Sequence, residues 1–236
     1  MSMLRRISEY VASASSGALS AIIEAVRTIL QGDPELRRRV AFSIAMIALS
    51  AKMAKADGVV TPNEVHAFHD IFSFPRHEMH NVTRLYDLAK QDVAGFEAYA
   101  RQMAGLCGSG SADCPMLEDI LDGLFHIAKA DGVLHERENS FLARVADIFS
   151  ISESHYARIR ARHVLGDRAD PYVLLGVSPD MPFPEIKRRY RELVMESHPD
   201  RLVARGVPME FLAIANARLA AINAAFEQIE KSWLPV

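Results

Sequence analysis

One six-residue sequence occurs twice in the chain, and this repeat limits the folds that the chain can adopt. Ala-Lys-Ala-Asp-Gly-Val stands at residues 54–59 and again at 128–133. Both copies later reach Asp-Ile-Phe-Ser, at 70–73 and 147–150. Self-similarity of this kind indicates that one supersecondary unit is used twice. The sequence therefore predicts an internal duplication within residues 35–166.

Each copy of the repeat follows a segment with the pattern of a buried helix. Residues 37–57 would be apolar on nearly all sides of a helix, and residues 116–131 take the same place in the second copy. A helix that is apolar all round is buried at the centre of a domain. Gly58 and Gly132 then favour a helix end, where a left-handed backbone conformation is common. Because no convincing strand pattern appears, we predict an all-α fold.

Two acidic pairs recur with the repeat. Asp57 and Glu64 in the first copy have the same separation as Asp131 and Glu138 in the second. Carboxylates that the duplication brings together could bind a divalent cation. Turn formation and helix capping explain the same residues, and we favour that interpretation. The sequence thus predicts no metal site and no cofactor, with these four residues as the candidates if a cation binds.

The repeated motif resembles the TerB family, an all-helical domain associated with tellurite resistance. The resemblance rests on Lys-Ala-Asp-Gly at 55–58 and at 129–132, each followed by the glutamate named above, and it covers residues 35–166. It implies a duplicated helical bundle. It also implies a link to metal binding and stress response, which keeps the divalent cation as an alternative.

A small helical hairpin is predicted after a linker. Residues 166–171 contain one glycine, two aspartates and one proline, which is typical of a break between domains. The next long helix begins near Pro184 and has its apolar seam at Ile186, Tyr190 and Leu193. The last helix has a seam at Leu212, Ala215, Leu219, Ile222, Phe226, Ile229 and Trp233. Spacings of three and four in both seams predict an antiparallel helix pair.

The tripeptide His198-Pro199-Asp200 lies between these two helices. Proline lacks an N–H group and disfavours helical geometry at the residue before it, so the first helix ends there. We therefore expect His198 and Asp200 at an exposed turn at the tip of the hairpin. Several cations of the first helix lie away from its apolar seam, on the solvent side: Lys187, Arg188 and Arg191.

The segments DPYVLLGV, EIKRRYREL, HPDR and AAINAAFEQI, in this order, resemble the J domain of the DnaJ family. The match covers residues 170–231, and we place the domain at 170–236. The resemblance implies a co-chaperone that docks on a DnaK-type heat-shock ATPase and speeds its ATP hydrolysis. In that reading His198, Pro199 and Asp200 form the essential turn. Lys187, Arg188 and Arg191 supply the charged docking face.

A TerB-like region followed by a J-like region resembles the DjlA-like J-domain proteins, which are anchored in a membrane. A span needs about 20 nearly uninterrupted apolar residues. In residues 1–34 Glu24 and Arg27 interrupt the apolar run. We therefore predict no transmembrane span but an amphipathic helix, which docks on the protein or lies on a membrane surface.

The composition excludes several functional classes. A net charge of −3 argues against a general nucleic-acid binder. No glycine-rich phosphate loop or nucleophile motif occurs, so we predict that the chain is not an enzyme. Cys107 and Cys114 lack the second pair of ligands that a metal site needs. We expect both thiols to be reduced, which favours a cytoplasmic location.

Two functions compete at this point. The first is a J-domain co-chaperone whose TerB-like domain directs it to particular clients or places. The alternative is a metal- or stress-responsive binding protein, in which the hairpin serves only as a docking handle. Binding of divalent cations by residues 1–166 would favour the alternative.

Overall fold

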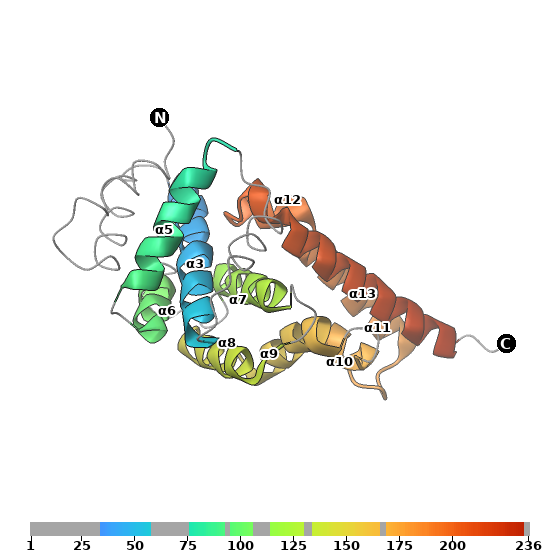
Figure 1. The fold of residues 1–236 in the computed structure, drawn as a ribbon. Coiled ribbons are helices and arrows are strands. Elements are labelled where there is room, and N and C mark those ends of the chain that lie inside the picture. Colours follow the sequence, from blue (N-terminus) through green and yellow to red (C-terminus); the bar gives the residue numbers. More distant parts are fainter. Residues whose placement is uncertain are drawn as a thin grey trace.

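The computed structural model describes residues 34–57, 76–92, 95–105, 114–129, 134–165 and 169–233. These residues form helices joined by turns, with no strand among them, which confirms the predicted all-α class. Figure 1 shows a helical bundle from which one long helix extends towards the C-terminus. The helices are α3 (Pro34–Asp57), α5 (Met79–Gln91), α6 (Phe96–Ala104), α7 (Pro115–Ala128), α8 (Glu136–Ile148), α9 (Glu153–Arg160), α10 (Pro171–Leu175), α11 (Phe183–Glu196), α12 (Pro199–Ala204) and α13 (Leu212–Trp233).

Helix α3 is the centre of the bundle. All residues from 40 to 54 are buried, because α5, α6, α7 and α8 pack around it (Figure 1). This confirms the central helix that the sequence predicts over 37–57. Helix α7 is the matching helix of the second copy, and it is buried on most of its surface. The two repeated segments therefore supply the two most deeply buried helices of the bundle.

One charged residue of α3 is buried with its partners. Lys52 donates a hydrogen bond from Nζ to the carbonyl of Asp92 at 2.8 Å, and its Nζ lies 4.9 Å from the centre of the Tyr99 ring. The Tyr99 hydroxyl donates to Oδ2 of Asp92 at 2.7 Å. Burial lowers the pKa of Lys52, although Asp92 opposes the change. These contacts satisfy the buried ammonium and tie α3 to the end of α5 and to Tyr99 of α6.

The hairpin closes through a second apolar core, as predicted. Ile186 and Leu193 of α11 face Ile222 and Phe226 of α13 in one buried cluster. The Tyr190 ring stacks on Phe226 with centroids 4.0 Å apart. Its hydroxyl donates to Oδ1 of Asn223 at 3.1 Å. Tyr190 is therefore part of this core, and its polar end is satisfied.

The predicted seam of the last helix divides between two cores. Ala215 belongs to the core of the bundle and not to that of the hairpin, together with Leu202, Val207, Phe211 and Ile214. Helix α13 has 22 residues and α11 has 14, so the beginning of α13 extends past the helix that should cover it. The bundle covers that part instead. The prediction of one continuous hairpin seam is wrong in this respect.

Several sequence predictions fall outside the described residues. They are the amphipathic helix predicted in residues 1–34, of which residues 1–33 are not described, and Gly58, Glu64, Asp131 and Gly132 of the repeat. Within the described ranges, none of the helices combines the length and the apolar character that a membrane crossing requires. Cys114 is disulfide-bonded, and the other cysteine, Cys107, is not among the described residues. The expectation of reduced thiols is wrong, and the cysteines give no support for a reducing compartment.

Candidate functional site

The turn at residues 197–200 is built by the end of one helix and the start of the next. Helix α11 ends at Glu196, and His198 is the N-cap of α12 in an extended conformation. Pro199 takes the first helical position, where its missing N–H costs nothing. The His198 carbonyl accepts a hydrogen bond from the Arg201 amide at 2.9 Å. The proline thus ends one helix and starts another, which fixes the direction of the His198 side chain.

The imidazole of His198 caps the new helix. Its Nδ1 accepts a hydrogen bond from the Asp200 amide at 3.2 Å. A neutral imidazole that accepts at Nδ1 carries its proton on Nε2. The His198 side chain is 55 % exposed and that of Asp200 is 93 % exposed. The turn therefore presents one N–H donor and one carboxylate to a partner, outside both cores.

The predicted basic face of α11 is exposed in part. The Arg188 side chain is 73 % exposed, and its Nε lies 4.0 Å from Oε1 of Glu192. Arg191 is exposed and Lys187 is half-buried. Neither Lys187 nor Arg191 forms an ion pair within the part of the chain that the structure describes. These two cations, four residues apart on one helix, remain available to an acidic partner.

Two glutamates reduce the positive charge near the turn. Glu192 contacts Arg188 and also accepts from Arg189 at 3.1 Å. Glu196 lies 3.7 Å from the same Arg189 nitrogen. Arg189 is turned towards these acids, whereas Lys187 and Arg191 are not. The face is thus less basic than its number of arginines indicates.

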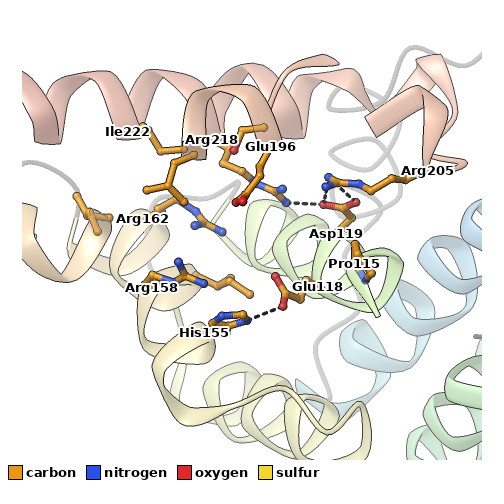
Figure 2. Close-up of a pocket in the computed structure, with 14 residues that line it drawn as sticks. Pro115, Glu118, Asp119, His155, Arg158, Arg162, Glu196, Arg205, Arg218 and Ile222 are labelled. Carbon is orange, nitrogen blue, oxygen red and sulfur yellow. Dashed lines mark hydrogen bonds and ion pairs between the residues drawn. The ribbon is translucent and has the colours of Figure 1, made fainter. Parts of the chain in front are cut away.

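A buried cluster of opposite charges lies behind the turn, and Figure 2 shows part of it. Asp119 and Asp122 of α7 are almost fully buried. Arg218 of α13 bridges them, with its Nη2 2.8 Å from Asp119 Oδ1 and 2.7 Å from Asp122 Oδ2. Arg205, which follows α12, reaches Asp119 Oδ2 at 3.0 Å. Two carboxylates of the bundle therefore bind two arginines of the C-terminal region.

The connection between the domains adds two more groups to this cluster. Residues Ala161–Leu165 form a π-helical turn. Arg162 donates to Oδ1 of Asp122 at 2.9 Å, and His163 Nε2 donates to the same oxygen at 2.8 Å. Two consecutive side chains of this turn therefore share one acceptor. We call these six residues, Asp119, Asp122, Arg162, His163, Arg205 and Arg218, the aspartate–arginine cluster.

The charges of the cluster shift the pKa values of its members. Burial favours the neutral form of Asp122, but Arg162, Arg218 and His163 hold the pKa of its carboxyl well below the usual range. Burial raises the pKa of Asp119, whereas Arg218 and Arg205 favour its ionised form. Burial would lower the pKa of Arg218, but the two aspartates raise it above its ordinary value. Asp122 and Arg218 are therefore charged at neutral pH.

A small cavity of about 70 Å³ lies between the two domains beside this cluster (Figure 2). Arginines 158, 162, 205 and 218 line it together with Glu118, Asp119 and Glu196. His155 on its edge is 2.6 Å from Glu118. Because charges of both signs line the cavity, it does not favour a ligand of one strong charge. We regard it as part of the seam between the domains.

Low pH should destabilise the region next to the aspartate–arginine cluster, because His126 becomes protonated there. Burial and then His163 lower the pKa of His126 from its ordinary 6.5, with Lys129 adding to the effect and Asp122 opposing it. The unfolded chain therefore takes up a proton more readily than the folded one. The contribution of neutral His126 to the free energy of unfolding is therefore fully present above about pH 6.5. It is lost as the pH falls below that value.

We expect the melting temperature to fall between about pH 7.5 and pH 5.5, and to fall less in His126→Gln. Circular dichroism at both pH values measures this. His77→Gln is a suitable control because His77 is an exposed histidine. An equal fall in the wild type and in His126→Gln would contradict the prediction.

The proposed cation ligands are not assembled among the described residues. Glu138 accepts a hydrogen bond from the His135 amide at 2.9 Å, which caps α8. Asp57 is the last residue of α3, and its side chain is not described. The described part of the chain holds no group of three His, Cys, Asp or Glu side chains that could bind a metal ion. Glu138 therefore has the capping role that the sequence favours.

Sequence reasoning missed the aspartate–arginine cluster. Its residues look like ordinary polar positions, because they belong to no motif and come from separate segments of the sequence. Asp119 and Asp122 are three apart in α7, on a helix buried nearly all round. That spacing puts both on one face of the helix. Two acids on one face of a buried helix were a signal that they needed cationic partners.

Two family models match the chain in sequence order. The model described as "Tellurite resistance protein TerB" matches residues 43–161. The model described as "DnaJ domain" matches residues 170–232. The bundle thus corresponds to a TerB domain, and the hairpin with its His-Pro-Asp turn corresponds to a J domain.

Curated relatives match this chain along most of its length. Co-chaperone protein DjlA of Photobacterium profundum is 30 % identical over 222 residues, which cover 82 % of this chain and 78 % of the relative. DjlA of Coxiella burnetii is 27 % identical, with 76 % and 73 % covered. DjlA of Escherichia coli K12 is 25 % identical, with 82 % and 80 % covered. No solved structure matches the chain significantly. From the two domains and these relatives, the chain belongs to the DjlA family of J-domain proteins.

Proposed function

We propose that this chain is a co-chaperone that stimulates the ATPase of a DnaK-type chaperone through its His-Pro-Asp turn. The J domain and the DjlA relatives support a co-chaperone role and a partner of this type. In this role the chain regulates another protein's hydrolysis and is not an enzyme itself. The observation that carries the proposal is the exposure of His198 and Asp200 on a turn that Pro199 makes rigid.

The chemistry of the turn fits a polar partner surface. Asp200 offers a carboxylate, which can accept hydrogen bonds from an arginine of the partner. His198 offers its Nε2–H, because Nδ1 already caps α12. Lys187 and Arg191 add positive charge that attracts an acidic surface. Such exposed charges change the association rate and its salt dependence more than the final geometry.

We also propose that the TerB domain selects the client or the place where the chain acts. Support comes from its size and its position before the J domain, because its surface away from the J domain can bind a second protein. The client itself is not identified by any residue described above. A pull-down that compares the wild type with His198→Gln would identify proteins that bind independently of the ATPase.

The first test is the ATPase rate of purified DnaK with increasing amounts of the chain. We expect the wild type to raise the rate and His198→Gln to leave it at the unstimulated value. The substitution removes the imidazole that caps α12 and the donor that it presents. His77→Gln is a matched control, because His77 is an exposed histidine of the TerB domain. A wild type without stimulation, or His198→Gln with full stimulation, would contradict the proposal.

A further inference from the structure

The helix that carries the His-Pro-Asp turn is seated on the TerB domain. Helix α12 has only six residues, and His198 caps its beginning. Leu202 in this helix and Val207 just after it are fully buried in the TerB core. Phe211 follows, and its ring contacts Phe42 of α3 edge to face, with centroids 5.1 Å apart. One end of α12 is thus exposed to solvent while the other end is part of another domain's core.

Gly206 brings the backbone after α12 directly onto α3. Its φ is +100°, a conformation that residues with a side chain rarely adopt. A Cβ atom at this position would lie 2.6 Å from the Cβ of Arg38. That neighbouring atom is part of α3 close to its backbone and cannot swing aside. Only glycine therefore allows this close approach of the turn segment to the TerB domain.

Arg205 adds a charged contact next to Gly206. Its Nη2 lies 3.2 Å from Oδ1 and 3.0 Å from Oδ2 of Asp119. Arg218 holds the other side of the same carboxylate. Separating such a pair would leave the Asp119 carboxylate buried with less counter-charge, which favours the arrangement in which the two groups meet. Arg205 and Gly206 together fix the end of α12 in position and in direction.

We propose that the TerB domain positions the His-Pro-Asp turn for stimulation of the ATPase, through Arg205 and Gly206. Both residues act on His198 and Asp200 through α12 and are positioning residues. This inference rests on the proposed function and deepens it. The TerB domain is then a structural part of the stimulating site and not only a separate targeting module.

The test compares two kinetic quantities in the DnaK assay, using the full chain. We expect Arg205→Gln and Gly206→Ala to lower the maximal stimulated rate by about 2- to 30-fold, the range for residues that couple two sites. The concentration that gives half of the effect should change less, because the cations of α11 are untouched. Arg191→Ala should instead raise the half-saturating concentration and change the maximal rate less.

Matched variants separate positioning from general damage. Arg101→Gln breaks an exposed ion pair with Glu97 in the TerB domain and should leave both quantities unchanged. Gly176→Ala places a Cβ at another positive φ, +64°, at the other end of the J domain, where it meets only the flexible Arg158 side chain, and it should leave both quantities unchanged. Arg205→Lys should restore part of the rate, because a single nitrogen of Arg205 makes both contacts to Asp119.

Hydrogen exchange gives a second readout that does not depend on DnaK. We expect Arg205→Gln and Gly206→Ala to speed exchange of the amides at 201–207 and to leave those of α11 unchanged. Slow exchange in both variants would overturn the inference. Full stimulation by both variants would also overturn it, while the proposed function would stand. A wild type that does not stimulate DnaK would instead overturn the proposed function, and with it the role in stimulation given to Arg205 and Gly206.

Discussion

Replacement of Phe211 by alanine should lower the free energy of unfolding by about 3–5 kcal/mol, the usual cost of removing a fully buried aromatic ring. Phe211 lies in the J-domain sequence, but its ring is fully buried in the TerB core against Phe42. The cavity left by the ring would lie between α3 and the start of α13. Urea unfolding followed by circular dichroism measures the loss.

Met209 provides the control for Phe211. It lies two residues earlier in the same short 3-10 turn and is 72 % exposed. Met209→Ala should change the stability by less than about 0.5 kcal/mol, as is usual for exposed positions. A small loss in Phe211→Ala, similar to that in Met209→Ala, would show that the J-domain sequence does not complete the TerB core.

Replacement of Asp122 by alanine should cost about 3–5 kcal/mol, because it leaves buried cations without their counter-charge. Asp122 accepts from Arg162, His163 and Arg218, and it is almost fully buried. Arg218 would still form its ion pair with Asp119, but Arg162 would lose the carboxylate that accepts its hydrogen bond. Urea unfolding at neutral pH, where Asp122 is ionised, is the appropriate measurement.

Asp147 is the matched control for Asp122. Its side chain is 72 % exposed, and it lies 3.8 Å from Arg144. Exposed ion pairs of this kind contribute at most about 1 kcal/mol. Asp147→Ala should therefore remain close to the wild type. If Asp122→Ala changed the free energy of unfolding as little as Asp147→Ala, the aspartate–arginine cluster would not stabilise the contact between the two domains.

The parts of the fold that follow from local periodicity were predictable. The long apolar run of α3 and the seams of α11 and α13 give a helical period over many residues, so the helices and their buried faces follow. The turn at His198 was predictable for a different reason, since a proline that follows a helical run cannot continue that helix but can start the next one. The exposure of this turn followed from its place at the tip of a hairpin.

The seam between the domains could not be predicted in the same way. Whether Ala215 packs on α11 or on the bundle depends on the relative lengths of α11 and α13 and on what lies beside them. Arg205 and Arg218 look like solvated surface residues, because nothing local marks them as buried. Their partners, Asp119 and Asp122, are about 90 residues away in sequence, so only the tertiary arrangement brings them together.

The division of α13 between two cores has a consequence for how such proteins can evolve. A J domain that completes its neighbour cannot be exchanged for a J domain from elsewhere by joining chains at the linker near residue 168. The incoming module would have to supply a ring in place of Phe211 and an arginine in place of Arg218. Recombination at that linker would therefore yield poorly folded chimaeras, and the two modules should be inherited together.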